Sequence, residues 1–371
     1  MSSKHLHIIS FDVPFPADYG GVIDVFYKIR ALHQAGYRVH LHCFEYGRPH
    51  APQLEAYCEQ VYYYERRMSK RYLFHPLPFI VVTRRSERLM QVLLKDNYPI
   101  LFEGLHSCYH LPDPRLQGRK LLVRTHNIEH DYYDNLAKVE SSTFRKAYFR
   151  REASKLRKYE QVLQQAAHIL AISRPDQDNL KKRYERVELL SAFHPNEQVN
   201  VGEGLGKFAL YHGNLEVGEN NEAALFLVQQ VFPDSSVPLV IAGKNPSTAL
   251  QQAVAKQPSV RLLANIPTSE IDALIRAAQI NILPTFQATG IKLKLLAALF
   301  NGRHCLVNSP MVMNTGLEKL CEIQDTAQGM RLEAEKLMQV PFGSAAVSQR
   351  TGALFPDFSN EENVRRLTRL L

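Results

Sequence analysis

The sequence predicts an α/β protein built from two parallel-sheet domains. Short β-branched or apolar runs alternate with amphipathic helical stretches along the chain, which is typical of parallel sheets covered by helices on both faces. The length of 371 residues suits two domains at roughly 100–200 residues each. Segment 193–206 interrupts the alternation with Pro195, three glycines and no apolar periodicity, which indicates a linker.

The first series of elements precedes this linker. After a strand over 5–10, a loop leads into a helix over 22–35, whose apolar residues recur at helical spacing. Gly36 is placed to end that helix, because glycine adopts the left-handed conformation easily. The strand over 38–44 alternates apolar residues, expected inward, with His40 and His42, expected outward. The other elements are strands over 61–64, 100–103, 121–125 and 169–173, and a long helix over 142–165.

A second series of the same kind follows the linker. Its helix over 269–278 has Thr268 or Ser269 as N-cap and Glu270 in the first turn, where a carboxylate faces the positive end of the helix dipole. The other elements are strands over 208–212, 237–242, 260–263, 280–284 and 305–307, and helices over 221–231, 247–256, 291–300 and 360–371. Two such units joined by one linker place a cleft between them, where ligands commonly bind. The predicted boundaries are an N-terminal domain over 1–195, a linker over 196–206, a C-terminal domain over 207–355, and a terminal helix over 356–371 that packs back on the N-terminal domain.

Composition and charge exclude several classes of protein. Forty-five Lys and Arg against 37 Asp and Glu give a net charge of +8, which favours acidic partners. The five cysteines are scattered without C-x-x-C spacing, as expected for free thiols in a reducing cytosol rather than a disulfide frame or a zinc site. No apolar run approaches the ~18 residues of a membrane span, and the first residues lack a signal-peptide core. The chain is expected to be soluble or peripheral.

The loop after the first strand is the first candidate site. Gly20 and Gly21 precede the helix and allow the backbone to approach a ligand closely. The amides of the first helical turn would then face a phosphate. The segment is not the dinucleotide-binding G-x-G-x-x-G motif, and a flexible loop remains the alternative interpretation.

Histidines at the carboxyl ends of two expected strands form the second candidate site, since open α/β sheets build their sites there. His126 could hydrogen-bond a sugar hydroxyl, or act as acid or base near neutral pH. Glu129 could orient His126 or contact an acceptor, and His106 occupies a similar strand-end position. Metal binding is disfavoured because no further ligand set follows His130. A structural role for either histidine is the alternative.

A turn and the helix after it form the third candidate site. Gly290 lies in the turn, and Lys292 and Lys294 lie in the first helical turn. Amides and ammonium groups that converge at a helix N-terminus bind anions. Because these positive charges oppose the helix dipole, helix stabilisation does not explain them.

Basic and aromatic residues crowd together in two segments of the first half. Segment 144–158 holds seven basic residues against Glu152 alone, and segment 62–88 adds seven more among Tyr and Phe residues. A basic helix with aromatic neighbours can lie on an anionic membrane surface, although a solvated charged face is the alternative. No nucleic-acid motif accompanies these residues, so a nucleic-acid partner is not expected.

Taken together, these features resemble the GT-B glycosyltransferases, in particular the retaining enzymes of glycosyltransferase family 4, over nearly the whole chain. The resemblance implies two Rossmann-like domains facing each other across a cleft. It implies a hexosyltransferase-like enzyme that moves a sugar from a nucleotide-sugar donor to a glycan or lipid-linked acceptor with retention, without a metal or cofactor. In that family a Gly-Gly loop follows the first strand, as Gly20-Gly21 does here, and a strand-end histidine contacts the donor sugar, as His126 is placed to do.

The C-terminal half carries the family's nucleotide-binding signature in altered form. The pattern Glu, seven residues, Glu has Thr289 and Ala297 at the glutamate positions here. The second family glutamate holds the ribose hydroxyls. A family arginine and lysine bind the diphosphate where this chain has Asn214 and Asn220. The resemblance assigns donor binding to Gly20, Gly21, Gly213, Asn214, Lys244, Thr289, Gly290, Ile291, Lys292 and Lys294, the catalytic position to His126, and the acceptor side to His106 and Glu129.

Two other functions stay open. The changes at Ala297 and Asn214 motivate a catalytically degenerate GT-B protein that acts as a binding or partner subunit. A GT-B sugar-nucleotide epimerase is the second alternative, and it needs carboxylate acid–base residues that the sequence does not assign. For the transferase, the expected location is the cytoplasm, at the inner face of the cell membrane.

Overall fold

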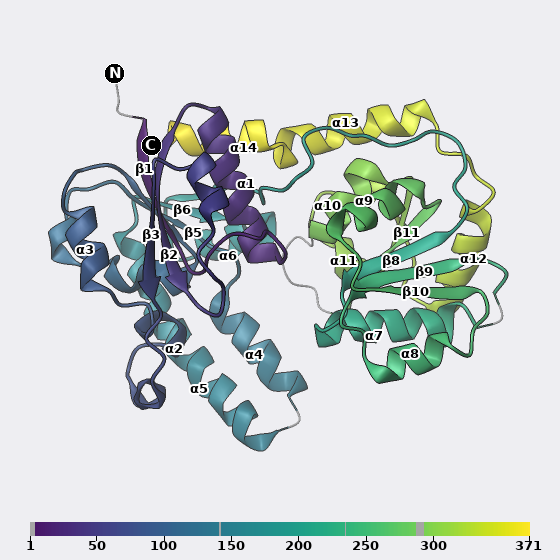
Figure 1. Ribbon diagram of the computed structural model, residues 1–371, viewed down its shortest axis with the longest axis horizontal. Coiled ribbons are helices and arrows are strands. Elements are labelled where there is room, and N and C mark those ends of the chain that lie inside the picture. Colours follow the sequence, from purple (N-terminus) through teal and green to yellow (C-terminus); the bar gives the residue numbers. More distant parts are fainter. Residues whose placement is uncertain (1–3, 141, 234, 287–292) are drawn as a thin grey trace. The chain divides into compact units, whose positions relative to one another are not determined.

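The computed structural model of the chain describes residues 4–140, 142–233, 235–286 and 293–371 (Figure 1). The chain forms two compact units. Unit 1 comprises Met1–Pro195 and Asp357–Leu371, and unit 2 comprises Asn196–Pro356. Each unit contains one parallel sheet, of seven strands in unit 1 and six in unit 2, so the prediction of two parallel-sheet α/β domains is confirmed. Within the described ranges, no helix combines the length and apolar character needed to cross a bilayer.

The sheet of unit 1 has the strand order β3-β2-β1-β4-β5-β6-β7. Its strands are β1 (His5–Ser10), β2 (Arg38–Glu45), β3 (Gln60–Glu65), β4 (Ile100–Glu103), β5 (Leu121–Arg124), β6 (His168–Ala171) and β7 (Val187–Leu189). Strand β1 pairs in parallel with both β2 and β4, so the direction in which strands are added reverses between β1 and β4. In open α/β sheets, ligands commonly bind at the carboxyl ends of the strands beside such a reversal.

Helices cover this sheet. They are α1 (Gly20–Gln34), α2 (Phe79–Val82), α3 (Glu87–Leu93), α4 (Glu129–Val139), α5 (Thr143–Tyr159), α6 (Arg174–Lys181) and α14 (Asn360–Arg369). Helix α1 ends before Gly36, whose φ of 78° confirms its predicted role. Helix α14 packs on α1, where Val364 and Leu367 join the core formed by α1 and the strands. Helices α4 and α5 lie side by side (Figure 1).

Three local expectations differ from the structure. His42 is fully buried rather than turned outward, because β2 lies between β1 and β3 with both faces of the sheet covered. The expected helix over 142–165 is α-helical only to Tyr159, and a 3-10 helix follows over Glu160–Gln165. The helix predicted to be capped by Thr268 or Ser269 instead has Pro267 at the N-cap, with no side-chain hydrogen bond there.

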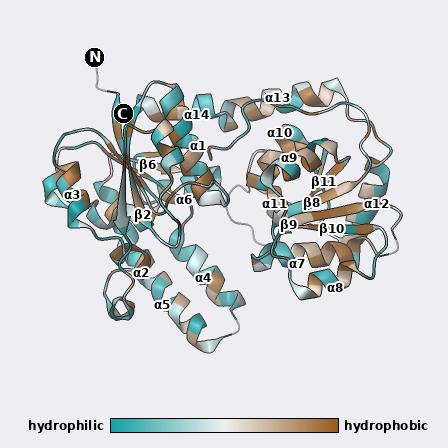
Figure 2. Ribbon diagram, in the orientation of Figure 1, coloured by the Kyte–Doolittle hydropathy of each residue, from teal (hydrophilic) through white to brown (hydrophobic). Residues whose placement is uncertain are grey.

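The sheet of unit 2 has the order β10-β9-β8-β11-β12-β13. Its strands are β8 (Ala209–Asn214), β9 (Leu239–Lys244), β10 (Val260–Ala264), β11 (Ile280–Ile282), β12 (His304–Val307) and β13 (Glu322–Ile323). Its helices are α7 (Gly218–Phe226), α8 (Thr248–Val254), α9 (Thr268–Ala277), α10 (Leu293–Asn301), α11 (Ser309–Val312), α12 (Ala327–Leu337) and α13 (Ser344–Phe358). The last two residues of α13 belong to unit 1. Figure 2 shows hydrophobic residues gathered in the strands of this unit. The strand order also reverses between β8 and β11, so the carboxyl ends of these strands are the expected ligand position in unit 2.

Candidate functional site

Polar side chains gather in unit 1 at the carboxyl ends of the strands beside the strand-order reversal. Glu103 ends β4 and Arg124 ends β5, and the two residues are neighbours in the parallel register. Helix α1, which follows the loop after β1, contributes Asp24 and Lys28 from one face because the two positions are one helical turn apart. These four charged side chains are at most 1% exposed.

The four residues form a buried ion network. The Lys28 ammonium lies 2.6 Å from Glu103 Oε1 and 3.1 Å from Asp24 Oδ2. Arg124 Nε lies 3.2 Å from the same oxygen of Asp24. Burial alone would raise the pKa of each carboxyl, but Arg124 and Lys28 hold the pKa of Asp24 below its usual range, and Lys28 with His126 does the same for Glu103. Both carboxylates therefore stay ionised opposite the two basic side chains, and the charges of the network balance.

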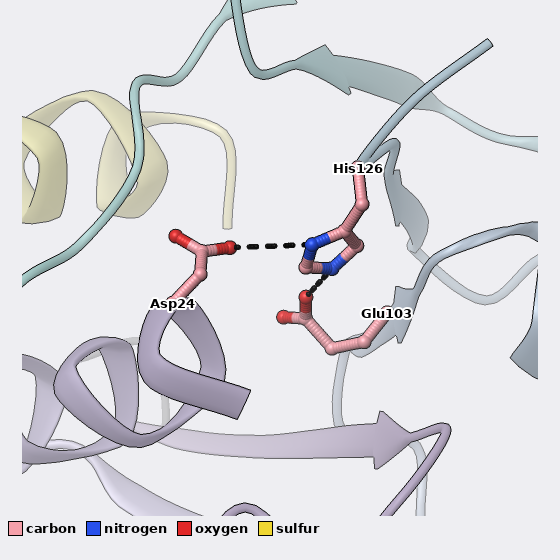
Figure 3. Close-up of side chains that lie close together, drawn as sticks. All are labelled: Asp24, Glu103 and His126. Atoms are coloured by element: carbon pink, nitrogen blue, oxygen red, sulfur yellow. Dashed lines mark hydrogen bonds and ion pairs between the residues drawn. The ribbon is translucent and has the colours of Figure 1, made fainter. Parts of the chain in front are cut away.

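His126 is held against this network, as Figure 3 shows. Its Nε2 lies 2.9 Å from Glu103 Oε2, and its Nδ1 lies 3.9 Å from Asp24 Oδ2. An ionised carboxylate only accepts, so the hydrogen between His126 and Glu103 is on Nε2. At 3.9 Å, Nδ1 is beyond hydrogen-bond distance of Asp24, which leaves it available to hydrogen-bond a ligand hydroxyl. The Phe11 ring meets the imidazole edge-on, at 5.4 Å between centroids.

Asp24, Glu103 and His126 are also the candidate ligands for a metal ion. Asp24, Glu103 and His126 each place one ligand atom within 4.8 Å of the others. Both carboxylates, however, already accept from buried cations, Lys28 and Arg124. A divalent ion would have to lie against these two positive charges, so the residues do not fit one. The carboxylates belong to the ion network.

His106, which is partly exposed, and the buried Glu129 form a second pair beside His126. Nδ1 of His106 lies 3.7 Å from Oε1 of Glu129, and among the described residues neither atom has a hydrogen-bond partner. Burial raises the pKa of Glu129 to about 8, with Glu160 adding to the effect and Arg84 opposing it. Burial, together with the charges of Arg84 and His126, places the pKa of His106 well below its usual value. Near neutral pH the pair is therefore an uncharged acid beside an uncharged imidazole, which is suited to proton transfer.

Two glycines allow these rings to lie where they do. Gly104 has a φ of 70°, and a Cβ there would be 3.0 Å from His106 Nδ1 and 3.6 Å from His126 Cδ2. At Gly21, the second residue of α1, a Cβ would be 2.7 Å from Phe11 Cζ. Glycine at position 21 therefore lets Phe11 lie on the first turn of α1. Tyr19 is the N-cap residue of α1, but its side chain makes no hydrogen bond to the backbone amides of the first helical turn, which begins at Gly20.

In unit 2, several predicted donor-binding residues meet at the ends of β8 and β9. Asn214 and Lys244 are paired in register. Lys294, near the start of α10, lies 2.9 Å from Asn220 Oδ1, and the Asn220 amide donates to the carbonyl of Asn214 at 3.0 Å. A Cβ at Gly213 would be 3.3 Å from Asn220 Cγ, so glycine makes room for this asparagine. The arrangement places an ammonium group beside amides at the strand-order reversal.

Other sequence predictions have different outcomes. Thr289, Gly290, Ile291 and Lys292 lie outside the described residues. Ala297 is half-buried on α10 and offers a ligand only a methyl group. The ion network itself was not predicted. Its members on helix α1, Asp24 and Lys28, are two charges one turn apart, a pattern that the sequence alone does not distinguish from a solvated pair.

Comparisons with known proteins support the fold. No protein-family profile matches the chain. An uncharacterised 44.6 kDa protein in the cps region of Klebsiella pneumoniae is 27% identical over 319 residues, which is 79% of this chain and 80% of that protein. Sucrose-phosphate synthase from Thermosynechococcus elongatus superposes with a TM-score of 0.69 at 15% identity, over 99% of this chain and 98% of the other.

The structure of Anabaena HepE in complex with UDP and glucose superposes with a TM-score of 0.66 at 10% identity, over 98% of each chain. At such low identities, these likenesses show the fold alone. The two parallel-sheet units match GT-B glycosyltransferases, so the chain has the GT-B fold that its sequence predicted.

Proposed function

We propose that the protein is a glycosyltransferase that moves a sugar from a nucleotide-sugar donor to a glycan or lipid-linked acceptor. The observation that carries the proposal is the setting of His126, fixed by Glu103 and with Nδ1 available to a ligand, at the carboxyl end of β5 beside the strand-order reversal. The GT-B likeness and the UDP and glucose present in the HepE structure support the donor class.

The roles follow from the chemistry of each group. Amides near residue 290 and the ammonium groups of Lys244, Lys292 and Lys294 would stabilise the diphosphate as it leaves. His126 and the Gly20-Gly21 loop would contact the sugar. The bond from the anomeric carbon to the diphosphate breaks, the acceptor oxygen bonds to the same face of that carbon, and the acceptor proton leaves with the diphosphate or through a nearby base. Lysines and amides supply the positive charge, so no metal is required.

A membrane-bound acceptor agrees with the surface of unit 1. Phe74 and Phe144 are 76% and 79% exposed, and Arg151 lies over the Phe74 ring at 5.7 Å. The exposed basic residues on α5 are Arg145, Arg150, Arg151, Arg157 and Lys158. Aromatic side chains among basic ones suit the interface of an anionic membrane, so the proposal includes peripheral binding at its cytoplasmic face. Flotation with phosphatidylglycerol vesicles should show binding that weakens as salt is raised, and salt-insensitive or absent flotation contradicts this part.

The donor is tested by thermal shift with UDP-, GDP-, ADP- and dTDP-sugars. A ligand that binds only the folded state adds about 2.7 kcal/mol of stability at 100 times its Kd, so one donor should raise the melting temperature. Lys294→Ala should weaken that donor's affinity at least tenfold, because a charged hydrogen bond contributes about 1.5–3 kcal/mol. Lys256→Ala, an exposed lysine after α8, is the matched control and should change nothing. No response to any donor would contradict the proposal.

One observation favours a second function. Glu129, held protonated beside His106, supplies the acid–base carboxyl that a GT-B sugar-nucleotide epimerase needs. Epimerisation at carbon removes a hydrogen and returns one from solvent. Incubation with a nucleotide sugar alone in D₂O therefore separates the functions: an epimerase incorporates deuterium into the sugar, and a transferase does not. Donor affinity without transfer or deuterium uptake indicates the degenerate binding subunit that Ala297 and Asn214 motivate.

A further inference from the structure

Two arginines near the candidate site of unit 1 form no ion pair with any carboxylate of the described residues. Arg84 follows α2 and is 4% exposed; its Nε donates to the Phe11 carbonyl at 2.9 Å and its Nη1 to the Ile80 carbonyl at 2.5 Å. Arg66 follows β3 and is partly exposed, and its Nε donates to Thr83 Oγ1 at 3.0 Å. The two guanidinium groups therefore lie on adjoining segments of the chain.

The positive charges of Arg66 and Arg84 act on each other. Burial lowers the pKa of Arg84 to about 9, and the charge of Arg66 is the next largest cause. The nearest acids compensate only in part: Asp12 opposes the lowering of the Arg84 pKa but already accepts from Tyr19 and from the Val13 amide, and the high pKa of Glu129 leaves it largely protonated. A buried cation beside a second, partly exposed one is costly without an anion to pair with, which indicates that an anion belongs there.

A buried arginine of unit 2 shows the contrast. Arg350 is 3% exposed, and it donates to three backbone carbonyls, those of Leu299, Gly302 and Arg303. A lone guanidinium satisfied in this way needs no counter-ion. Arg84 donates to only two carbonyls and has a second guanidinium beside it.

The position of the pair connects it to the candidate site. Arg84 holds the Phe11 carbonyl, and the Phe11 ring lies 5.4 Å from both His106 and His126. We propose that Arg66 and Arg84 bind a phosphate or carboxylate group of the acceptor substrate. Paired guanidinium groups match the planar and bidentate geometry of these anions. The assignment to the acceptor rests on the proposed function, in which the donor diphosphate is bound by residues of unit 2.

The test measures anion binding to the full chain by calorimetry, with inorganic phosphate, glucose 6-phosphate, glucuronate and uncharged glucose as probes. The wild type should bind at least one anionic probe and bind glucose more weakly. Arg66→Gln should lower that affinity at least tenfold, whereas Arg67→Gln, the exposed next residue, should leave it unchanged. Arg66→Lys keeps the charge but loses the bidentate geometry, and should give an intermediate affinity. Arg66 is chosen because it is partly exposed, whereas the replacement of Arg84 could unfold the loop.

A soluble sugar phosphate and a lipid-linked phosphate carry the same phosphate group, which Arg66 and Arg84 would bind in the same way. A parallel arm with phosphatidylglycerol vesicles distinguishes the two sources. Anion binding that depends on Arg66 in either arm supports the proposal. The absence of anion binding by the wild type, or equal binding by Arg66→Gln and Arg67→Gln in both arms, overturns it. The nucleotide-sugar thermal shift is run on the same samples. A donor response without anion binding overturns only this inference, and anion binding without a donor response overturns only the transferase.

Discussion

Replacement of Asp24 by asparagine removes one of the two carboxylates that neutralise Lys28 and Arg124. Oδ1 of Asp24 also accepts the backbone amide of Phe193 at 2.7 Å, so both oxygens of the carboxylate are used. In Asp24→Asn the network carries a net charge of +1 at side chains that are at most 1% exposed. Breaking a buried ion pair by removing one partner costs roughly 3–5 kcal/mol. We expect the free energy of unfolding of unit 1 to fall by about 4 kcal/mol.

Urea denaturation followed by tyrosine fluorescence suits this measurement. The chain has no tryptophan, and 16 of its 17 tyrosines precede residue 196, so the signal reports unit 1 almost alone. Glu361→Gln is the control, because Glu361 forms an exposed ion pair with Arg365, and such pairs contribute about 0.3–0.5 kcal/mol. Lys28→Met added to Asp24→Asn restores neutrality and should recover part of the loss. A loss below about 1 kcal/mol, or no recovery in the double variant, would refute the reasoning.

Two further predictions concern the glycine behind the histidines and the pH dependence of stability. Gly104→Ala places a methyl group 3.0 Å from His106 Nδ1 and should lower donor-dependent transfer activity. The control is Gly118→Ala, because Gly118 has a similar φ but, beyond its chain neighbours, no described residue within 4 Å of the added methyl group. Equal effects of the two substitutions in a transfer assay would contradict the role of the contact. Burial lowers the pKa of His7 to about 4, although Asp96 opposes the shift. In the unfolded chain the pKa of this histidine is 6.5, so below pH 6.5 the unfolded chain binds more protons than the folded one. The free energy of unfolding should therefore fall as the pH falls from 6.5 to about 4, by up to about 3 kcal/mol from this residue. Urea curves at pH 7, 5.5 and 4.5 check this, with His7→Gln expected to show the smaller change.

The fold was predictable because its signal is spread over the whole chain. The alternation of apolar runs with helical periodicity predicted β1 over 5–10 and β4 over 100–103 at their observed bounds. Short elements carry too little pattern to detect, which is why the three-residue strand β7 and the two-residue strand β13 were missed. Periodicity also does not separate an α-helix from the 3-10 helix that continues it after Tyr159.

The site was predictable only in part. His106, His126 and Glu129 were identified because polar residues after a buried strand have few structural explanations, and the structure brings these three together. Charged residues inside a helix are usually solvated, so Asp24 and Lys28 carried no such signal alone. Their burial depends on partners 75 and 100 residues away in the sequence, which local patterns do not contain. His42 was misjudged for a related reason, since alternation along one strand does not reveal that both faces of the sheet are covered.

The ion network links the orientation of His126 to the path by which the chain leaves unit 1. Arg124 donates to the carbonyls of Leu190 and Ser191, and Asp24 accepts the amide of Phe193, shortly before the unit boundary at Pro195. The same carboxylate thus helps to fix the environment of His126 and the departing segment. A change at Asp24 should alter stability and ligand binding together, because one charge serves both. A change at Gly104 should alter the histidines while the network and the segment stay in place. Comparing the two variants therefore separates the contribution of the histidines to binding from that of the scaffold that holds them.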